Sequence, residues 1–300
     1  MLNRIGLGTA QLGMEYGVAN TTGRPGEAEG LKILAEAVSH GVTLLDTARA
    51  YGDSEALLGA FIARNHRAAE LRIVSKLTSL GGRPLTSDHF LSELRGSLRT
   101  LGAAALYAWL LHDVRDVIRD RRAFESAAAR AKDLQLTEKV GISVYGHEDL
   151  DSLQDVAGID VVQLPLSIFD QRLLRSGHVD RLMSLGVEIH ARSLFLQGAL
   201  LMPPMALPAH LSGLRPAAER LQAVAAERGL TTYETSLAFA YATPQIDCWI
   251  IGVETISQVK ELLRCADKAS EYADRAAGLA YAHLAVEDSV LVNPRTWRPA

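Results

Sequence analysis

Short apolar runs of the kind that form buried strands alternate with longer segments of helical periodicity along the whole chain. The segment 27–40, for example, carries Leu31, Leu34 and Val38 on one helical face, and the apolar run 42–46 follows it directly. Eight such strand–helix units favour one closed (β/α)8 barrel, a TIM barrel, over an open doubly wound sheet. No predicted strand is followed by the Gly-x-Gly-x-x-Gly turn that is typical of a Rossmann fold.

The boundaries of the predicted elements follow from these patterns. Strands are expected at 5–9, 42–46, 72–76, 105–112, 140–143, 159–163, 187–192 and 248–251. Helices are expected at 27–40, 54–63, 87–101, 121–134, from about 148, and at 178–185, 216–228, 232–242 and 255–266, with Ser87 as a candidate N-cap. Because side chains alternate along the strand that leads to His112, Trp109 should face away from the barrel interior and pack in the core.

The composition excludes several classes of function. A net charge of −4 gives no electrostatic reason to expect a nucleic acid or an anionic membrane as partner. Cys248 and Cys265 stand far apart in apolar or helical surroundings, which is typical of reduced packing residues and not of a disulfide or metal site. No apolar stretch approaches the ~20 residues that span a bilayer, and the first residues lack the apolar region of a secretory signal. We therefore expect a cytoplasmic protein that needs no metal.

Polar side chains stand at the ends of three successive predicted strands, where such barrels place their functional groups. Asp46 ends the second strand, Lys76 ends the third and His112 ends the fourth, while Tyr51 lies in the loop after Asp46. Each has an ordinary structural explanation: a capping carboxylate, a solvated lysine, a hydrogen-bonded histidine, a half-buried tyrosine. Four such residues at neighbouring strand ends are much less expected by chance than any one of them, so the sequence predicts a catalytic site here.

The four side chains suit the protonation of a carbonyl oxygen while a hydride arrives at its carbon. A tyrosine with a pKa near ~10 is a poor acid at neutral pH unless a nearby cation favours its phenolate. Lys76 can supply that cation, Asp46 can hold it, and His112 can donate a hydrogen bond to the substrate oxygen. The competing chemistry is a Schiff base formed by Lys76, which requires a desolvated lysine that is not paired with a carboxylate.

The order of these motifs resembles the aldo-keto reductase superfamily over about residues 5–266. The resemblance implies NAD(P)H-dependent reduction of an aldehyde, ketone or sugar carbonyl to an alcohol, in one barrel domain over 1–300 with a C-terminal extension from about 267. It also implies Tyr51 as general acid, Lys76 as its activator, Asp46 as the partner of Lys76 and His112 as the group that orients the carbonyl. The matching motifs are Gly8-Thr9, Asp46-Thr47-Ala48-x-x-Tyr51-Gly52, Ser75-Lys76, Leu111-His112-Asp113, Gly141-Ile142-Ser143, Gln163 and the segment from Trp249 to Thr255.

The resemblance further implies a cofactor site at the strand ends and the loops that follow them. It assigns Ser143 and Gln163 to the nicotinamide carboxamide. Arg192 stands where many members have an aromatic residue, so its guanidinium is a candidate to stack on the nicotinamide. The remaining implied residues are Gly8, Thr9, the pyrophosphate-loop residues Ser193, Leu194, Gln197 and Gly198, and the adenosine-end residues Gly252, Glu254, Thr255 and Gln258.

The cofactor implied by the resemblance is NADPH, with NADH as the alternative. Members often carry Lys or Arg where Glu254 and Gln258 stand here. Glu254 would repel a 2′-phosphate and can accept from a ribose hydroxyl, which favours NADH. Thr255-x-x-Gln258 reads as a capping box, which would commit Gln258 to the backbone.

Loops should select the small-molecule carbonyl substrate. The loop 13–26 brings Tyr16, a rival proton donor, toward the mouth, and the loop 198–213 is either a lid or ordered packing. The segment 288–300, with Trp297, either folds back near the site or covers a helix. A non-catalytic subunit that binds nicotinamide remains an alternative, although a pure binding role does not require all four catalytic candidates. No sequence feature defines an oligomeric state.

Overall fold

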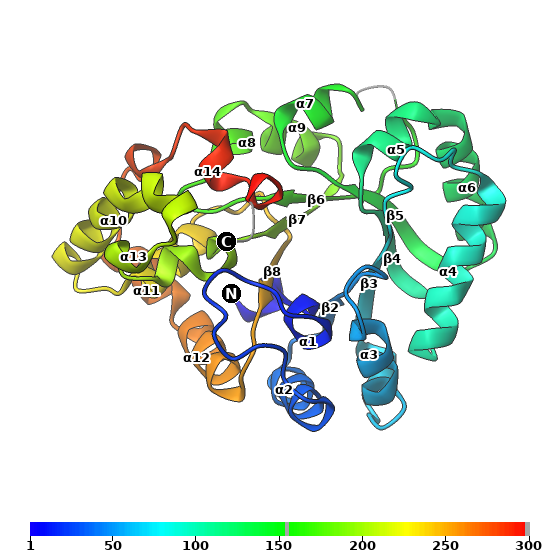
Figure 1. The fold of residues 1–300 in the computed structure, drawn as a ribbon, viewed down its shortest axis with the longest axis horizontal. Helices are drawn as coiled ribbons and strands as arrows, with labels where there is room; N and C mark the ends of the chain where they lie inside the picture. The colour runs from blue at the N-terminus through cyan, green and yellow to red at the C-terminus, as the bar shows by residue number, and fades with distance from the viewer. Residues whose placement is uncertain (154–155, 298–300) are drawn as a thin grey trace.

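Eight parallel strands close into a barrel in chain order, with the last strand hydrogen-bonded to the first (Figure 1). The computed structural model describes residues 1–153 and 156–297. The predicted single-domain (β/α)8 barrel is confirmed. The strands are β1 (Ile5–Gly8), β2 (Leu44–Asp46), β3 (Arg72–Leu77), β4 (Leu106–Leu111), β5 (Thr137–Ser143), β6 (Val161–Pro165), β7 (Glu188–Arg192) and β8 (Cys248–Gly252).

Helices lie around the strands in Figure 1 and cover the outer face of the barrel. The longer ones are α2 (Glu27–Ser39), α3 (Ser54–Ile62), α4 (Ser87–Leu101), α6 (Arg121–Asp133), α10 (Arg215–Glu227), α11 (Thr232–Tyr241) and α12 (Ile256–Asp267). The short ones are α1 (Ala10–Gly13), α5 (Val114–Arg119), α7 (His147–Asp151), α8 (Arg172–Arg175), α9 (His178–Ser184), α13 (Ala269–Arg275) and α14 (Ser289–Val292). Within the described residues, no helix has the length and apolar character needed to cross a bilayer.

Some predicted boundaries are wrong. The N-cap of α4 is Thr86, not Ser87, since the Thr86 side chain accepts from the backbone N–H of His89. The sixth strand begins two residues later than predicted and continues to Pro165, because its pairing with β7 extends to Arg192. The sequence patterns do not predict the helices α1, α5, α8, α13 and α14, which have only four to seven residues each.

The interior of the barrel is layered. Side chains alternate along a strand, so Asp46 follows Leu44, and Lys76 follows Val74, on the same inward face. The polar strand ends therefore stand at the mouth directly above an apolar layer. The members of this layer form a buried cluster distinct from the larger core between strands and helices: Leu44, Val74, Ala108, Leu110, Val161, Cys248 and Ile250.

Trp109 and the two cysteines occupy packed positions, as predicted. The indole of Trp109 is fully buried and meets the ring of Phe90 on α4 edge-on, with ring centroids 6.4 Å apart. Cys248 and Cys265 are both buried free thiols. Their role in the fold is to fill space.

A network of charged side chains closes the opposite, N-terminal end of the barrel. Glu188 accepts a hydrogen bond from Tyr107 Oη at 2.7 Å and forms an ion pair with Lys139. Its other oxygen lies 2.6 Å from Nε2 of the buried His190. Burial raises the pKa of Glu188, but the hydrogen bonds from these three partners outweigh burial and lower the pKa from 4.5 to about 2. This end of a TIM barrel typically serves stability.

Replacing Glu188 with Gln should lower the free energy of unfolding by about 3 kcal/mol at neutral pH, because Lys139 loses its carboxylate partner. Since the folded-state pKa lies below the ordinary value, this carboxylate stabilises the fold above pH 4.5, and the contribution is lost as the pH falls toward 2. Urea denaturation across this range should therefore show a flatter pH dependence for Glu188→Gln. The exposed Glu227→Gln is the control. A loss of stability that is equal at both ends of the range would contradict this role.

The loop 198–213 is ordered and packs against the core. It consists largely of three short 3-10 helices, η3 (Leu196–Leu201), η4 (Pro204–Ala206) and η5 (Ala209–Leu214). The side chains of Leu200, Leu207 and Leu211 are buried in the core. Of the two alternatives for this loop, burial of its leucines favours the packed one.

Residues 288–297 fold back to the mouth of the barrel, while 298–300 of the predicted segment lie outside the described residues. Residues 288–297 pass through α14 and one 3-10 turn, η7 (Pro294–Thr296), beside the loop 198–213, and are red in Figure 1. The ring of Trp297 meets that of His210 with centroids 6.3 Å apart. Arg295 reaches Asp113, the residue after His112, with Nη2 3.3 Å from Oδ2. The segment therefore lies near the predicted site.

Candidate active site

The end of β2 meets the end of β3 in a buried ion pair. Lys76 Nζ donates to Asp46 Oδ1 at 2.6 Å and to the carbonyl oxygen of Thr47 at 2.9 Å. Gln163 Nε2 donates to the second Asp46 oxygen at 2.8 Å. Lys76 is 0% exposed and Asp46 is 3% exposed. Burial lowers the pKa of Lys76, and the charge of Asp46 acts against this shift.

Tyr51 lies on a turn that places its ring above this ion pair. The turn requires glycine at the next position, because Gly52 has a φ of +54° and a Cβ there would lie 2.4 Å from the carbonyl oxygen of Gly13. Lys76 Nζ is 5.1 Å from the Tyr51 ring centroid, and the ring of His112 meets Tyr51 edge-on at 5.8 Å. The structure thus brings all four predicted catalytic residues together.

The electrostatics of Tyr51 differ from the sequence expectation. Burial, and then the charge of Asp46, raise the pKa of Tyr51, although the proximity of Lys76 suggested a lowered value. Among the described residues no side chain or backbone group hydrogen-bonds the Tyr51 hydroxyl. The phenol is therefore protonated at neutral pH and free to donate to a ligand.

His112 is a neutral imidazole in this environment. Burial lowers its pKa from 6.5 to about 3, and the charges of Lys76, Arg192 and Arg295 contribute to the shift. The side chain is half-buried beside Tyr51. A neutral histidine retains one ring N–H that can donate to an oxygen.

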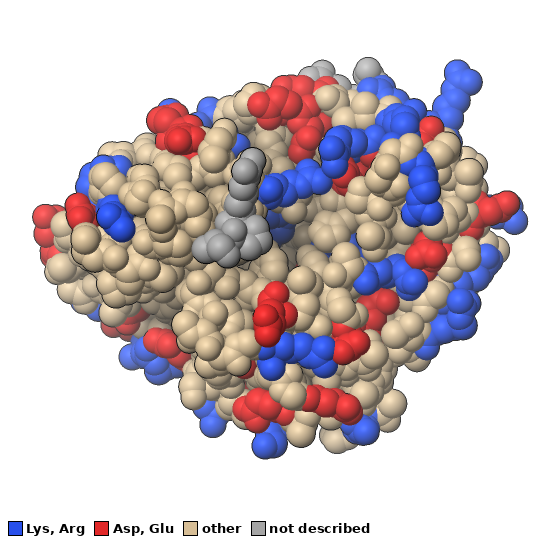
Figure 2. Space-filling view, viewed as in Figure 1, with Lys and Arg blue, Asp and Glu red and all other residues tan. Residues whose placement is uncertain are grey.

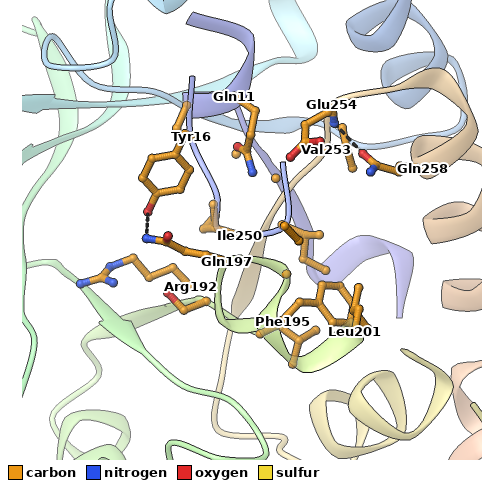
Figure 3. A pocket seen from close by; sticks show the side chains of 18 of the residues that line it. Gln11, Tyr16, Arg192, Phe195, Gln197, Leu201, Ile250, Val253, Glu254 and Gln258 are labelled. Atoms are coloured by element: carbon orange, nitrogen blue, oxygen red, sulfur yellow. Dashed lines mark hydrogen bonds between the residues drawn. The ribbon is translucent and has the colours of Figure 1, made fainter. Parts of the chain in front are cut away.

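A cavity of about 480 Å³ extends from Tyr51 to the start of α12 (Figure 3), a size typical of small-molecule and cofactor sites. Lys76 and His112 are not among the residues that line it, but both lie beside Tyr51, which does. Two predicted residues do not line the cavity: Ser143, which is buried, and Thr255, which is the N-cap of α12. The predicted residues that do line it are Gly8, Thr9, Asp46, Tyr51, Gln163, Arg192, Ser193, Leu194, Gln197, Gly198, Gly252, Glu254 and Gln258.

Glycines let neighbouring segments approach closely in part of the cavity wall. Gly8 and Gly252 pair with each other on the neighbouring strands β1 and β8, and both line the cavity. Gly198, with a φ of +88°, brings the loop after β7 against Ala19, where a Cβ would lie 2.5 Å from the alanine Cβ. The cavity is lined by polar side chains, among them Gln11, Ser193 and Gln197, beside closely approaching backbone. This lining suits an extended polar ligand such as a dinucleotide, so the residues present fit the implied cofactor.

Two loops meet over this cavity. Gln197 Nε2 donates to Tyr16 Oη at 3.0 Å, drawn as a dashed line between these two residues in Figure 3. The backbone N–H of Ala19 also donates to the Gln197 carbonyl oxygen at 3.4 Å. Ser193 and Gln197 both have positive φ, 66° and 55°, which is uncommon for residues with side chains. The Tyr16 hydroxyl is thus committed to a contact between loops, unlike that of Tyr51.

The far end of the cavity is acidic. Glu254 and Glu261 line it, and burial raises the pKa of Glu254. Thr255 Oγ1 accepts from the Gln258 N–H at 3.2 Å, but Gln258 Oε1 accepts from the N–H of Glu254 at 2.7 Å and not from that of Thr255. The predicted capping box is therefore shifted by one residue in its second bond. Within the described residues, no Lys or Arg lines this end.

The sequence profile of the Aldo/keto reductase family matches residues 4–274. This chain belongs to that family. The members of this family are oxidoreductases, which generally use NAD(P)H and act on small-molecule carbonyl compounds.

Known relatives agree with this assignment. Aldo-keto reductase YhdN from Bacillus subtilis (strain 168) is 25% identical over 185 residues, which are 58% of this chain and 53% of that protein. The match thus spans about half the length of this curated relative. Two solved structures share the fold: aldo-keto reductase AKR11C1 from Bacillus halodurans, with a TM-score of 0.71 and 18% identity over 95% of this chain and 94% of that one, and glycerol dehydrogenase AKR11B4 from Gluconobacter oxydans, with 0.69 and 17% over 93% and 92%.

Some residues of this aldo/keto reductase that shape the site have no sequence signal. Phe195 and Tyr233 stack at 4.6 Å with an angle of 15° and form an aromatic side of the cavity. Gln11 fills the space beside Gly252. Tyr145 packs against the guanidinium of Arg192 at 4.0 Å. Each contact joins segments far apart in the sequence, so no local spacing predicts it.

Proposed function

We propose that this protein reduces the carbonyl of a small aldehyde, ketone or sugar to an alcohol, with Tyr51 as the proton donor. The observation that carries the proposal is the Tyr51 hydroxyl: it faces the cavity, has no hydrogen-bond partner among the described residues and stands above the buried Lys76–Asp46 pair. A panel of carbonyl compounds, with cofactor oxidation followed by absorbance, tests it. No turnover of any member with either reduced cofactor would refute it.

Each side chain has a distinct role in this proposal. A reduced nicotinamide supplies the hydride when it is bound. Tyr51 gives its phenolic proton to the carbonyl oxygen, and the charge of Lys76, 5.1 Å from the ring centroid, stabilises the phenolate that is left. Asp46 keeps Lys76 charged and in place. Neutral His112 donates a hydrogen bond to the same oxygen and orients the carbonyl.

The cofactor residues carried over from the resemblance remain part of the proposal. Gln163 has a second task, because its amide nitrogen binds Asp46 and only its oxygen is left for a carboxamide. The positions of Ser193, Leu194 and Gln197 in the cavity wall support their assignment to the pyrophosphate. Ser143 and Thr255 do not line the cavity, so their roles stay predictions.

We also propose that the cofactor is NADH, the alternative that the sequence left open. Glu254 and Glu261 face the end of the cavity next to α12, and the nearest cation in the sequence, Lys260, does not line it. A 2′-phosphate would meet carboxylates there, whereas a ribose hydroxyl can donate to one. Fluorescence titration should therefore show NADH binding at least about tenfold more tightly than NADPH, a difference of about 1.4 kcal/mol.

A charge reversal tests the origin of this preference. Glu254→Lys should weaken NADH binding and strengthen NADPH binding. The dissociation constant of NADPH divided by that of NADH should therefore fall. Glu227→Lys places the same charge on an exposed part of α10 and serves as the control. Tighter binding of NADPH to the unmodified protein would refute the assignment of Glu254.

The Schiff-base alternative lacks support from the geometry. Lys76 is desolvated, but its Nζ is held by Asp46 and by the carbonyl oxygen of Thr47, which favours the charged and non-nucleophilic form. Borohydride trapping of a substrate on Lys76 would favour that alternative. The presence of all four catalytic candidates around one cavity likewise argues against a purely regulatory subunit.

A further inference from the structure

We propose that the barrel mouth binds an anionic group of the carbonyl substrate, a carboxylate or a phosphate, through Arg192 and Arg295. This inference rests on the proposed reduction and adds the class of substrate. Arg192 ends β7, and Arg295 lies in η7 of the C-terminal segment. Their guanidinium carbons lie 4.0 and 4.3 Å from the centroid of one ring, that of Tyr145, so the fold brings two positive charges together.

The charge of Arg192 is not neutralised by the protein. Over residues 1–153 and 156–297 it forms no ion pair, and its one hydrogen bond runs from Nη2 to the Val144 carbonyl oxygen at 3.0 Å. A guanidinium has five N–H donors, so most of them remain available. The side chain is half-buried and lines the cavity that contains Tyr51. A partly desolvated cation without a counterion favours a ligand that brings one.

The nearby carboxylates do not balance the cations. Asp113 lies 3.3 Å from Arg295 but already accepts a closer pair of bonds from Arg115, at 2.5 and 2.9 Å. Asp149 accepts from the backbone N–H of Tyr145. Both carboxylates are therefore already engaged, and within the described residues no carboxylate forms an ion pair with Arg192. Figure 2 shows Lys and Arg side chains inside and along the upper edge of the central hollow on this face.

Arg192 and Arg295 lie close enough to His112, the residue proposed to orient the reacting carbonyl, to affect its charge. Together with burial and Lys76, Arg192 and Arg295 lower the pKa of His112. In the proposed reaction His112 touches the carbonyl oxygen, so an anion held by the arginines would belong to the same small molecule. The other source of an anion is the cofactor diphosphate, which the loop 193–198 is proposed to bind.

Matched substrate pairs test the proposal. The first pair is para-carboxybenzaldehyde and its neutral methyl ester, and the second is glyceraldehyde phosphate and glyceraldehyde. The unmodified protein should favour the charged member of at least one pair by about 10- to 100-fold in kcat/KM, the effect of a charge-assisted hydrogen bond. Arg295→Gln and Arg192→Gln should each reduce this ratio mainly through KM, and Arg295→Lys should retain part of it.

The controls separate the competing explanations. Arg64 is an exposed arginine whose Nη1 lies 3.9 Å from Glu27 Oε1, and it is not part of the proposed anion site. Arg64→Gln should therefore leave the substrate ratio unchanged. An equal loss for charged and neutral substrates would indicate a structural role and overturn the proposal. Weaker cofactor binding with an unchanged substrate ratio would assign the cations to the cofactor and also overturn it.

A binding measurement covers failure of the proposed function itself. If no carbonyl compound is reduced, calorimetry with benzoate and benzamide still compares an anion with its neutral counterpart. Benzoate should bind more tightly, by about tenfold or more, and Arg295→Gln should remove the difference. Equal binding of the two compounds would overturn the anion site independently of any turnover.

Discussion

Tyr51→Phe should lower kcat by about 10²- to 10⁴-fold, the usual contribution of a positioned proton donor. Only the hydroxyl is removed, and among the described residues it has no protein partner to lose, so folding should not change. The ring remains in place beside His112, at a centroid distance of 5.8 Å. Steady-state kinetics on the best substrate of the carbonyl panel measures the loss, and fluorescence titration should show cofactor binding within about twofold of the unmodified protein.

Tyr16→Phe is the matched comparison for this experiment. It removes a second tyrosine hydroxyl of the cavity, which accepts from Gln197 and, among the described residues, has no contact with a lysine. Its effect on kcat should be far smaller than that of Tyr51→Phe. Retained turnover in Tyr51→Phe together with a large loss in Tyr16→Phe would move the role of acid to Tyr16.

Lys76→Met should reduce both turnover and stability. The phenolate of Tyr51 loses the nearby positive charge that stabilises it, so the rate falls and the pH profile of kcat moves to higher pH. Asp46 is left as a buried carboxylate whose one remaining side-chain hydrogen bond from the described residues is that of Gln163, at 2.8 Å. Removal of one partner from a buried ion pair costs about 3–5 kcal/mol of unfolding free energy. Kinetics over a pH series and urea denaturation measure the two effects.

The double variant Asp46→Asn/Lys76→Met separates chemistry from folding. With no buried charge left unpaired, it should recover most of the stability lost in Lys76→Met. Turnover should stay low, because Lys76 is still absent. If the double variant regains turnover as well, the loss in Lys76→Met comes from the fold and not from the missing cation.

The strand-end residues could be predicted because, in a barrel of parallel strands, a residue at the end of any strand lies at the mouth. Once eight strands are recognised, Asp46, Lys76 and His112 must share the mouth, since all parallel strands end at one face. Tyr51 follows from its place in the loop after Asp46. The prediction required no knowledge of contacts across the barrel.

The environment of these residues could not be predicted in the same way. The pKa of Tyr51 depends on how deeply the ring is buried and on its approach to Asp46, and neither is set by spacing along the chain. The contact of Tyr145 with Arg295 joins the loop after β5 to the C-terminal segment. Both are products of packing, which no periodicity encodes.

The apolar layer inside the barrel makes the two polar ends independent. Glu188 and Arg192 stand at opposite ends of β7, about 13 Å apart at the rise of a strand. Substitutions separated by more than about 7–10 Å without shared partners are usually additive. The lower network can therefore be strengthened to tolerate costly changes at the mouth, so that new substrate preferences can be selected without rebuilding the fold. During evolution, residues that stabilise the fold and residues that select the substrate can therefore change independently.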